Sequence, residues 1–250
     1  MLKFLTFLSL FFAFQVSSQL KLEVKVDDFE QNKSVLPKTF NIYQSMIAHK
    51  GYILEFTLTN TSDQPVSFPL DTLSYAIPFT EDTRVYYEEE NVSSNPDRLY
   101  RLGVYGFIDQ NGPVSEGGIG CEMPDIVEHP DHKKAREERE KTISEWERKN
   151  HFKTQGLMVN NWYIMKSMVV MKPEERIQYK IYFNPFFKKL CHYCYTEYYD
   201  GLNPELPYEV NFKIILNKNL YTLLTEKQKQ QYKNLYTEVV TSNTLRFEGQ

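Results

Sequence analysis

A stretch near the start of the chain decides the fold: Tyr52-Ile53-Leu54-Glu55-Phe56-Thr57-Leu58-Thr59, followed by Asn60-Thr61-Ser62-Asp63-Gln64-Pro65. Its apolar residues at even positions alternate with Glu55, Thr57 and Thr59, which predicts a strand with one buried face and one face in water. The Asn, Ser, Asp and Pro residues that follow are typical of a tight turn. Alternation of this kind favours an antiparallel sheet.

The same alternation recurs in both halves of the chain, over residues 20–26, 177–183 and 208–216. A turn at Lys172-Pro173-Glu174-Glu175 joins the run 162–171 to the next strand, and further strands are expected at 101–109 and 238–247. Abundant aromatic residues, 18 Tyr and 17 Phe, also favour strands. Roughly seven to nine short strands separated by turns predict a mainly β fold, an antiparallel β-sandwich.

One segment departs from this pattern and predicts a helix over residues 131–150. It contains neither Gly nor Pro, and its charges recur with helical spacing, as in Glu137 and Lys141. Few of its positions are apolar, so we expect a surface helix with Trp146 docked on the body. Residues 110–158 are interpreted as an insertion between two strands.

A second, shorter helix is expected over residues 225–236, where Thr225 can cap the N-terminus. Both helices are candidate partner surfaces, because insertions in the loops of a sandwich often carry function.

The turn-flanked strand at 52–62, with Pro65-Val66 after it, resembles the opening of exported bacterial immunoglobulin-like domains. The segment Met171-Lys172-Pro173-Glu174-Glu175 and the terminal Thr241-Ser242-Asn243 fit the same class. The resemblance implies an immunoglobulin-like sandwich and a role in binding or assembly, and it transfers no catalytic residue. The helical insertion departs from that family.

The N-terminus predicts a secretory signal over residues 1–18. Lys3 precedes the apolar run Phe4 to Phe14, and Val16-Ser17-Ser18 forms a small-residue exit. We expect cleavage before Gln19, a single domain over 19–250, and an exported protein that is periplasmic or secreted. The rival interpretation is an uncleaved anchor or a buried helix. The apolar run is too short for a membrane-spanning helix, and no transmembrane segment is expected after the signal is removed.

The net charge restricts the possible classes of partner, and the cysteine content restricts the number of disulfides. Removal of residues 1–18, whose one charge is Lys3, takes the formal net charge from −4 to −5. A weakly acidic chain lacks the basic footprint of a nucleic-acid-binding protein. Three cysteines allow at most one intramolecular disulfide.

The sharpest chemical motif is Cys191-His192-Tyr193-Cys194. Three interpretations stay open: a structural disulfide, within the pair or with Cys121; thiol–disulfide exchange by the pair; and a zinc site. The zinc site would combine three thiols with nearby imidazoles, using Cys121, Cys191, Cys194, His129 and His132.

Tyrosines cluster beside this motif and can form a platform for a protein or a glycan, whereas packing in the core is the alternative. The candidate surface comprises Tyr193, Tyr195, Tyr198, Tyr199 and Trp146. The common hydrolase and phosphate-binding motifs do not occur, and no cofactor is expected. The sequence thus predicts a non-catalytic exported binding or assembly module of the cell envelope. The alternatives are a thiol-exchange module and a small structural zinc protein.

Overall fold

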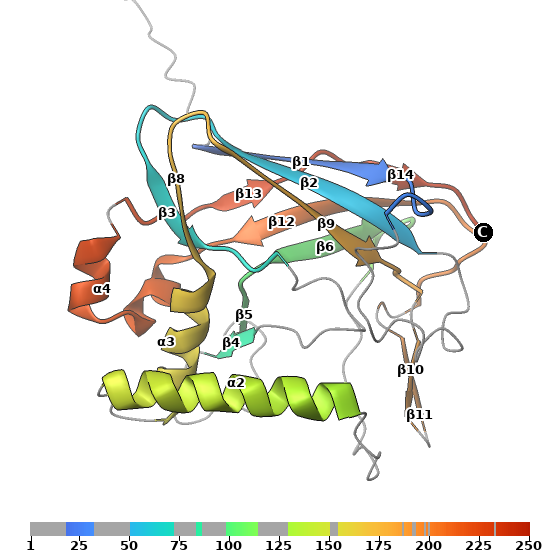
Figure 1. The fold of residues 1–250 in the computed structure, drawn as a ribbon. Coiled ribbons are helices and arrows are strands. Elements are labelled where there is room, and N and C mark those ends of the chain that lie inside the picture. The colour runs from blue at the N-terminus through green and yellow to red at the C-terminus, as the bar shows by residue number, and fades with distance from the viewer. Residues whose placement is uncertain are drawn as a thin grey trace, which may run out of the picture.

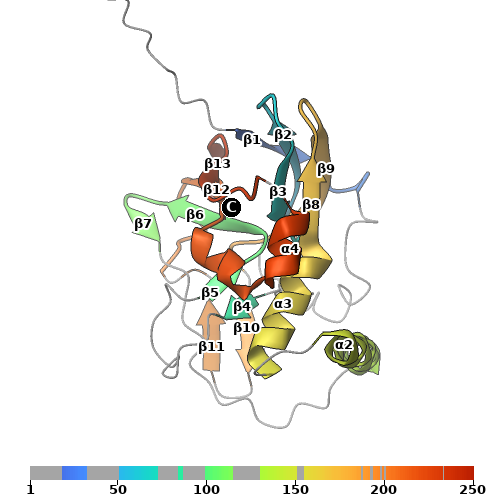
Figure 2. The same ribbon diagram turned by 90° about the vertical axis from the view of Figure 1, so that its left-hand side faces the viewer.

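The computed structural model describes residues 19–32, 51–72, 84–86, 99–114, 130–150, 155–186, 188–191, 194–197, 199, 201–232 and 234–250. Over these residues the protein is mainly β, with antiparallel sheets and a few helices, so the predicted fold class is confirmed at this level. Figures 1 and 2 show two layers of strands with the helices gathered at one end. The predicted signal, residues 1–18, lies outside the described residues.

The first layer contains β1 (Leu20–Asp27), β2 (Tyr52–Asn60) and β9 (Arg176–Phe183), with β2 in the middle and both neighbours antiparallel to it. Its register sets Phe56 between Val24 on one side and Tyr179 on the other. Most apolar positions of the alternating pattern are buried on the inner face, whereas Val26, near the end of β1, is 47% exposed. The polar positions lie on the outer face, as the sequence predicts.

The second layer is built around β12 (Tyr208–Ile215), which pairs with β6 (Val104–Asp109) and with β13 (Val239–Thr241) and β14 (Leu245–Phe247). A short strand, β7 (Pro113–Val114), extends it beyond β6. The single strand expected at 238–247 is therefore interrupted. At the break, the Ser242 N–H donates to the Phe212 carbonyl at 2.8 Å, and the Ser242 hydroxyl accepts from the Phe212 N–H at 2.9 Å.

Aromatic rings join the two layers. The Phe56 and Phe212 rings pack edge to face with centroids 5.0 Å apart, and Phe183 packs on Phe212 at 5.4 Å. Phe56 and Phe212 are both fully buried. Burial of one such side chain contributes about 1.5–3 kcal/mol, so this contact is a main source of cohesion between the layers.

One pair of strands continues past the first layer after a bend. β3 (Val66–Pro69) follows β2 and pairs with β8 (Met168–Met171), which precedes β9. The buried Asn60 side chain holds the bend, because its Nδ2 donates to the carbonyls of Met171 and Gln64 at 3.0 and 2.9 Å. The turns predicted at 60–65 and 172–175 both lie at this bend.

The edge of β1 is closed by a side chain. Asn243, between β13 and β14, donates from Nδ2 to the Val24 carbonyl at 2.9 Å and accepts at Oδ1 from the Val24 N–H at 2.8 Å. An amide in this position satisfies the backbone groups of an edge strand much as another strand would.

The helices confirm two predictions and contradict one. α2 (Pro130–Lys149) matches the charged helix, and α4 (Glu226–Gln231) begins with the predicted Thr225 cap but is shorter than expected. The interpretation of 162–171 as one extended run is wrong. Residues up to 167 belong to α3 (Gln155–Ser167), in which Met158, Asn161 and Trp162 are buried with helical spacing.

Two further hairpins and a short helix complete the described structure: β4 (Arg84–Tyr86) with β5 (Leu99–Arg101), β10 (Lys188–Cys191) with β11 (Cys194–Glu197), and η5 (Lys218–Leu223). Of the helices described, none has both the length and the apolar character that crossing a bilayer requires.

Candidate functional site

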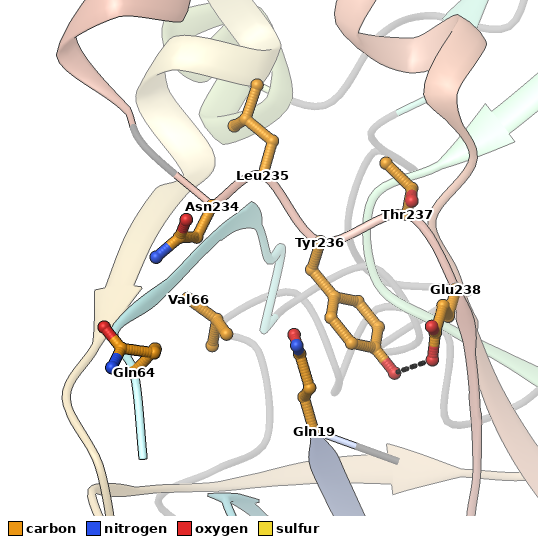
Figure 3. A pocket seen from close by; sticks show the side chains of 8 residues that line it. All are labelled: Gln19, Gln64, Val66, Asn234, Leu235, Tyr236, Thr237 and Glu238. Atoms are coloured by element: carbon orange, nitrogen blue, oxygen red, sulfur yellow. Dashed lines mark hydrogen bonds between the residues drawn. The ribbon is translucent and has the colours of Figure 1, made fainter. Parts of the chain in front are cut away.

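A groove of about 300 Å³ opens beside the beginning of β1. Its walls are Gln19, Gln64, Val66 and the segment Asn234–Glu238 (Figure 3). Three distant parts of the chain meet here: the residue before β1, the bend between β2 and β3, and the link from α4 to β13. We call this feature the Gln19 groove.

Backbone hydrogen bonds fix the segment 234–238 between the two layers. The Ser67 N–H donates to the Asn234 carbonyl at 3.1 Å, and the Tyr236 N–H donates to the Ser67 carbonyl at 3.0 Å. At the other end, the Leu216 N–H donates to the Glu238 carbonyl at 3.2 Å. Asn234 adopts a left-handed φ of 55°, a conformation that Asn tolerates better than most residues. The segment is thus a fixed wall of the groove.

Tyr236 anchors this wall in the core. Only 3% of it is exposed, and its ring packs against Phe68 with centroids 6.4 Å apart. Its carbonyl accepts a hydrogen bond from the Tyr221 hydroxyl, whose burial raises the Tyr221 pKa above its ordinary value. Its own hydroxyl lies 3.4 Å from Oε2 of Glu238, at the edge of hydrogen-bonding distance.

The backbone carbonyls of Gln19 and Gln64 accept hydrogen bonds that stabilise the fold, and their side chains line the groove. The Gln19 carbonyl accepts from the Thr61 N–H at 2.8 Å, and the Gln64 carbonyl accepts from the side chains of Asn60 and Ser62. Within the described part of the chain, neither side-chain amide has a hydrogen-bond partner, and both line the groove (Figure 3). Each amide can donate and accept.

The chemistry of the groove is therefore hydrogen bonding around one carboxylate, that of Glu238. Asn234 and Thr237 add an amide and a hydroxyl, and Leu235 adds apolar surface, whereas Val66 is 1% exposed. Across the residues that the structure describes, no three His, Cys, Asp or Glu side chains gather as metal ligands would.

A separate charged cluster on the outer face of the first layer has a structural role. Lys180 lies 2.6 Å from Asp27 and 3.4 Å from Glu55, and it donates to Asn32 at 2.8 Å. Its hydrogen bond lowers the pKa of Asp27, and a hydrogen bond from Lys25 is the largest cause that lowers the pKa of Glu55. These contacts fasten the residues after β1 to the sheet.

The sequence-predicted cysteine site is only partly placed. The register of β10 and β11 sets Cys191 directly opposite Cys194. Their side chains, with those of Tyr195 and His132, lie outside what the structure describes, as do Cys121, His129, Tyr193 and Tyr198 altogether. The structure therefore does not bring the predicted zinc ligands together or separate them.

Two residues of the predicted aromatic surface are placed, and both serve the fold. Tyr199 is 1% exposed and donates from its hydroxyl to the Gly106 carbonyl at 3.2 Å, so its assignment to an exposed platform is corrected to a core position. Trp146 is half-buried, as expected for a docked helix, and its Nε1 donates to Oδ1 of Asn161 at 3.2 Å.

Sequence reasoning missed the Gln19 groove. Residues 234–236 were assigned to a helix because Tyr232 and Leu235 fit its apolar stripe. A usable signal was Asn234 itself, since Asn is favoured over most residues in the left-handed conformation that ends a helix.

Comparison with known proteins adds no relative: the chain matches no protein-family model and is similar to no curated protein. A functional assignment must therefore rest on the geometry described above.

Proposed function

We propose that the chain is a non-catalytic exported binding or assembly module of the cell envelope, built on an immunoglobulin-like sandwich, and that it holds its ligand in the Gln19 groove. The observation that carries the proposal is a cavity with a fixed wall, lined by the exposed side-chain amides of Gln19 and Gln64, neither of which has a hydrogen-bond partner among the described residues. Small-ligand sites are typically concave and largely pre-formed, with a few placed polar groups.

Two features of the fold support this role. The facing antiparallel layers with an aromatic core have the arrangement that sandwich-type binding domains share. The groove also lies at one end of the layers, where strands give way to connecting segments, and binding residues of such folds concentrate there.

The position of the groove bears on export. Gln19 is both a wall of the groove and the first residue after the predicted signal. Cleavage before Gln19 would remove the chain that precedes this wall, so the exported form would present the groove without that chain.

The proposal is tested with mature protein, residues 19–250, and ligand-observed NMR against a panel of neutral oligosaccharides, acidic oligosaccharides and short peptides. Gln64→Trp is designed to fill the groove from its mouth. Gln31→Trp is the matched control, because Gln31 is exposed beyond the far end of β1, about 25 Å away at the usual rise of a strand.

We expect at least one class of ligand to bind the native protein and the Gln31→Trp variant but not the Gln64→Trp variant. Unfolding curves of the three proteins verify that the groove variant is folded. If no ligand of the panel depends on position 64, the groove is not the binding site and the proposal fails.

A second candidate function, thiol–disulfide exchange by Cys191 and Cys194, is favoured by their register. Residues directly opposed across antiparallel strands lie about 4.5 to 5.5 Å apart at Cα, and disulfides span about 4.4 to 6.8 Å. Rapid reaction of the reduced thiols with a disulfide probe tests exchange, and intact mass after denaturing alkylation, with and without reductant, tests the state of the cysteines. One alkylated thiol without reductant fits a disulfide, whereas three alkylated thiols and a native mass heavier by one zinc favour the metal site.

A further inference from the structure

The first layer has one sealed edge and one open edge. Asn243 closes the edge of β1, whereas β9 forms the other margin of the layer, with β2 between them (Figure 2). We propose that the open part of β9, Arg176–Lys180, binds an extended peptide as an added antiparallel strand. The peptide carries apolar side chains on one face and a carboxylate opposite Arg176. This site is separate from the Gln19 groove.

The register shows which backbone groups of β9 point outward. The Asn60 N–H, at the end of β2, donates to the Glu175 carbonyl at 3.1 Å. In an antiparallel pair, every second residue bonds to the neighbouring strand, so the N–H and carbonyl groups of Arg176, Gln178 and Lys180 point away from β2. Within the part of the chain that the structure describes, these outward groups have no hydrogen-bond partner.

This part of β9 lacks the features that usually protect an edge strand. Its pairing with β2 runs without a bulge from Arg176 to Phe183, and the strand contains no proline. An edge lysine can also keep another strand away. Lys180, however, leans over β2 toward β1, where its ammonium lies 3.4 Å from Glu55 and 2.6 Å from Asp27. The outward backbone groups are therefore available to pair with another strand.

The inner-face side chains favour apolar residues in the added strand. Ile177 and Tyr179 are half-buried, and they lie on the inner face of β9 at its open edge. Side chains that stand opposite each other across two strands, or one step diagonal, pack together. Two apolar residues on the inner face of the added strand would therefore cover the exposed parts of Ile177 and Tyr179.

Arg176 adds a preference for an acidic residue. Its side chain is exposed and has no ion pair within the described structure, and its neighbour on β2 is the uncharged Thr59. Glu174 and Glu175 lie in the turn before it, where the Glu175 carboxylate accepts from the Lys172 N–H at 2.7 Å. A carboxylate opposite Arg176 on the added strand would be its direct cross-strand partner, and opposite charges stabilise such a pair.

A second copy of the chain suits this edge less well. Two β9 strands that pair through all three outward residues would set Arg176 opposite Lys180 of the other copy at both ends. Like charges directly opposite each other destabilise a sheet. The open part is also far shorter than the roughly 20–30 residues per side of a standard protein–protein interface. A short extended segment of a partner protein needs only the strand edge.

The test uses the blocked peptide Thr-Val-Thr-Val-Glu, which sets its glutamate opposite Arg176 and its central threonine opposite Gln178. Dissociation constants are measured on the mature protein by NMR titration. We expect saturable binding in the millimolar range, because one short strand offers few contacts. N-methylation of the central threonine removes the donor to the Gln178 carbonyl and should weaken binding about tenfold. N-methylation of the valine after it, whose N–H faces away from β9, should change binding less than about twofold.

Arg176→Glu reverses the charge at the open edge. We expect it to weaken binding of the glutamate peptide about three- to tenfold, and the peptide Thr-Val-Thr-Val-Lys should recover the affinity. Arg246→Glu is the matched control, since the Arg246 side chain is 66% exposed on β14 of the other layer. It should change neither constant.

Three results would overturn the proposal. The first is the absence of saturable binding to the native protein, and the second is an equal loss of affinity from the two N-methylations. The third is a dimer of the native protein in sedimentation that Gln178→Pro converts to a monomer, which would assign the edge to a second copy. Gln178→Pro removes an N–H that does not bond to β2, so its unfolding curve should stay close to that of the native protein. All three results leave the Gln19 groove untouched.

Discussion

Replacement of Asn161 by alanine should loosen the whole helical end of the protein. Asn161 is fully buried in α3 and joins three other elements. Its Nδ2 donates to the Leu223 carbonyl at 2.8 Å and to Oε1 of Gln228 at 2.7 Å. Its Oδ1 accepts from Nε2 of Gln228 at 3.1 Å and from the Trp146 indole at 3.2 Å. We call these residues the Asn161 network.

The size of the expected loss of unfolding free energy depends on which former partners of Asn161 can hydrogen-bond to water instead. Trp146 is half-buried and can be hydrated when Asn161 is lost. The Leu223 carbonyl and the Gln228 amide are buried, and each buried group left without a partner costs about 1–3 kcal/mol. Gln228 keeps one bond, from the Thr225 N–H at 2.8 Å. We therefore expect a loss near 3 kcal/mol, a large part of a typical total of about 5–15 kcal/mol.

Urea unfolding measures this loss. With a slope of about 2–3 kcal/mol per molar urea, the midpoint should fall by roughly 1 to 1.5 M. Both tryptophans of the chain, Trp146 and Trp162, lie in the helices that the network joins, so their fluorescence reports on this end while circular dichroism reports on the whole fold.

Asn219→Ala is the matched control, the same substitution at an exposed position of η5, where a change within about 0.5 kcal/mol is expected. If Asn161→Ala shifts the midpoint no more than Asn219→Ala and leaves the emission maximum unchanged, the network does not hold the helices and the reasoning is refuted.

Three more outcomes follow from the structure. Asn60→Ala should destabilise the protein by about 2–4 kcal/mol, because it removes the buried amide that holds the bend; a urea midpoint like that of the native protein would contradict this. Lys180→Met should flatten the acid dependence of stability. The pKa of Asp27 in the folded protein lies below its ordinary value of 3.8, so its contribution to the unfolding free energy is complete above that value and is lost as the pH falls through the folded pKa. Without Lys180 this loss of stability should not occur. Unfolding free energies that fall in parallel with pH for the two proteins would argue against this role of Lys180. The exported protein should begin at Gln19, and a mass that retains residues 1–18 would disprove cleavage there.

The strands were predictable because each carries its own signal. The alternation around Phe56 and around Phe212 directly indicates that one face of each strand is buried, and in the structure both side chains lie on the buried face. The capping residue Thr225 was also visible, since a cap depends on residues only three positions away.

The predictions failed where a segment fits both the helical and the strand periodicity, or where contacts with segments far away in the sequence determine the structure. Residues 162–171 are mostly apolar, interrupted by Lys166 and Ser167, and a short apolar run does not distinguish a helix from a strand. In the structure the residues up to Ser167 are helical, and Asn161 of the same helix contacts α4. The Gln19 groove depends on bonds such as that from Tyr236 to Ser67, which no local pattern reports.

The Asn243 clamp on β1 has a consequence for how the chain acquires its structure. Val24 and Asn243 are 219 positions apart, so the edge of the first strand is sealed by a residue that is synthesised 219 positions later. Contacts of such long sequence separation slow folding, because a large loop must close before they form. The nascent chain therefore carries the edge of β1 unsealed at least until Asn243 has left the ribosome, and the described architecture is completed only after β13 and β14 have followed.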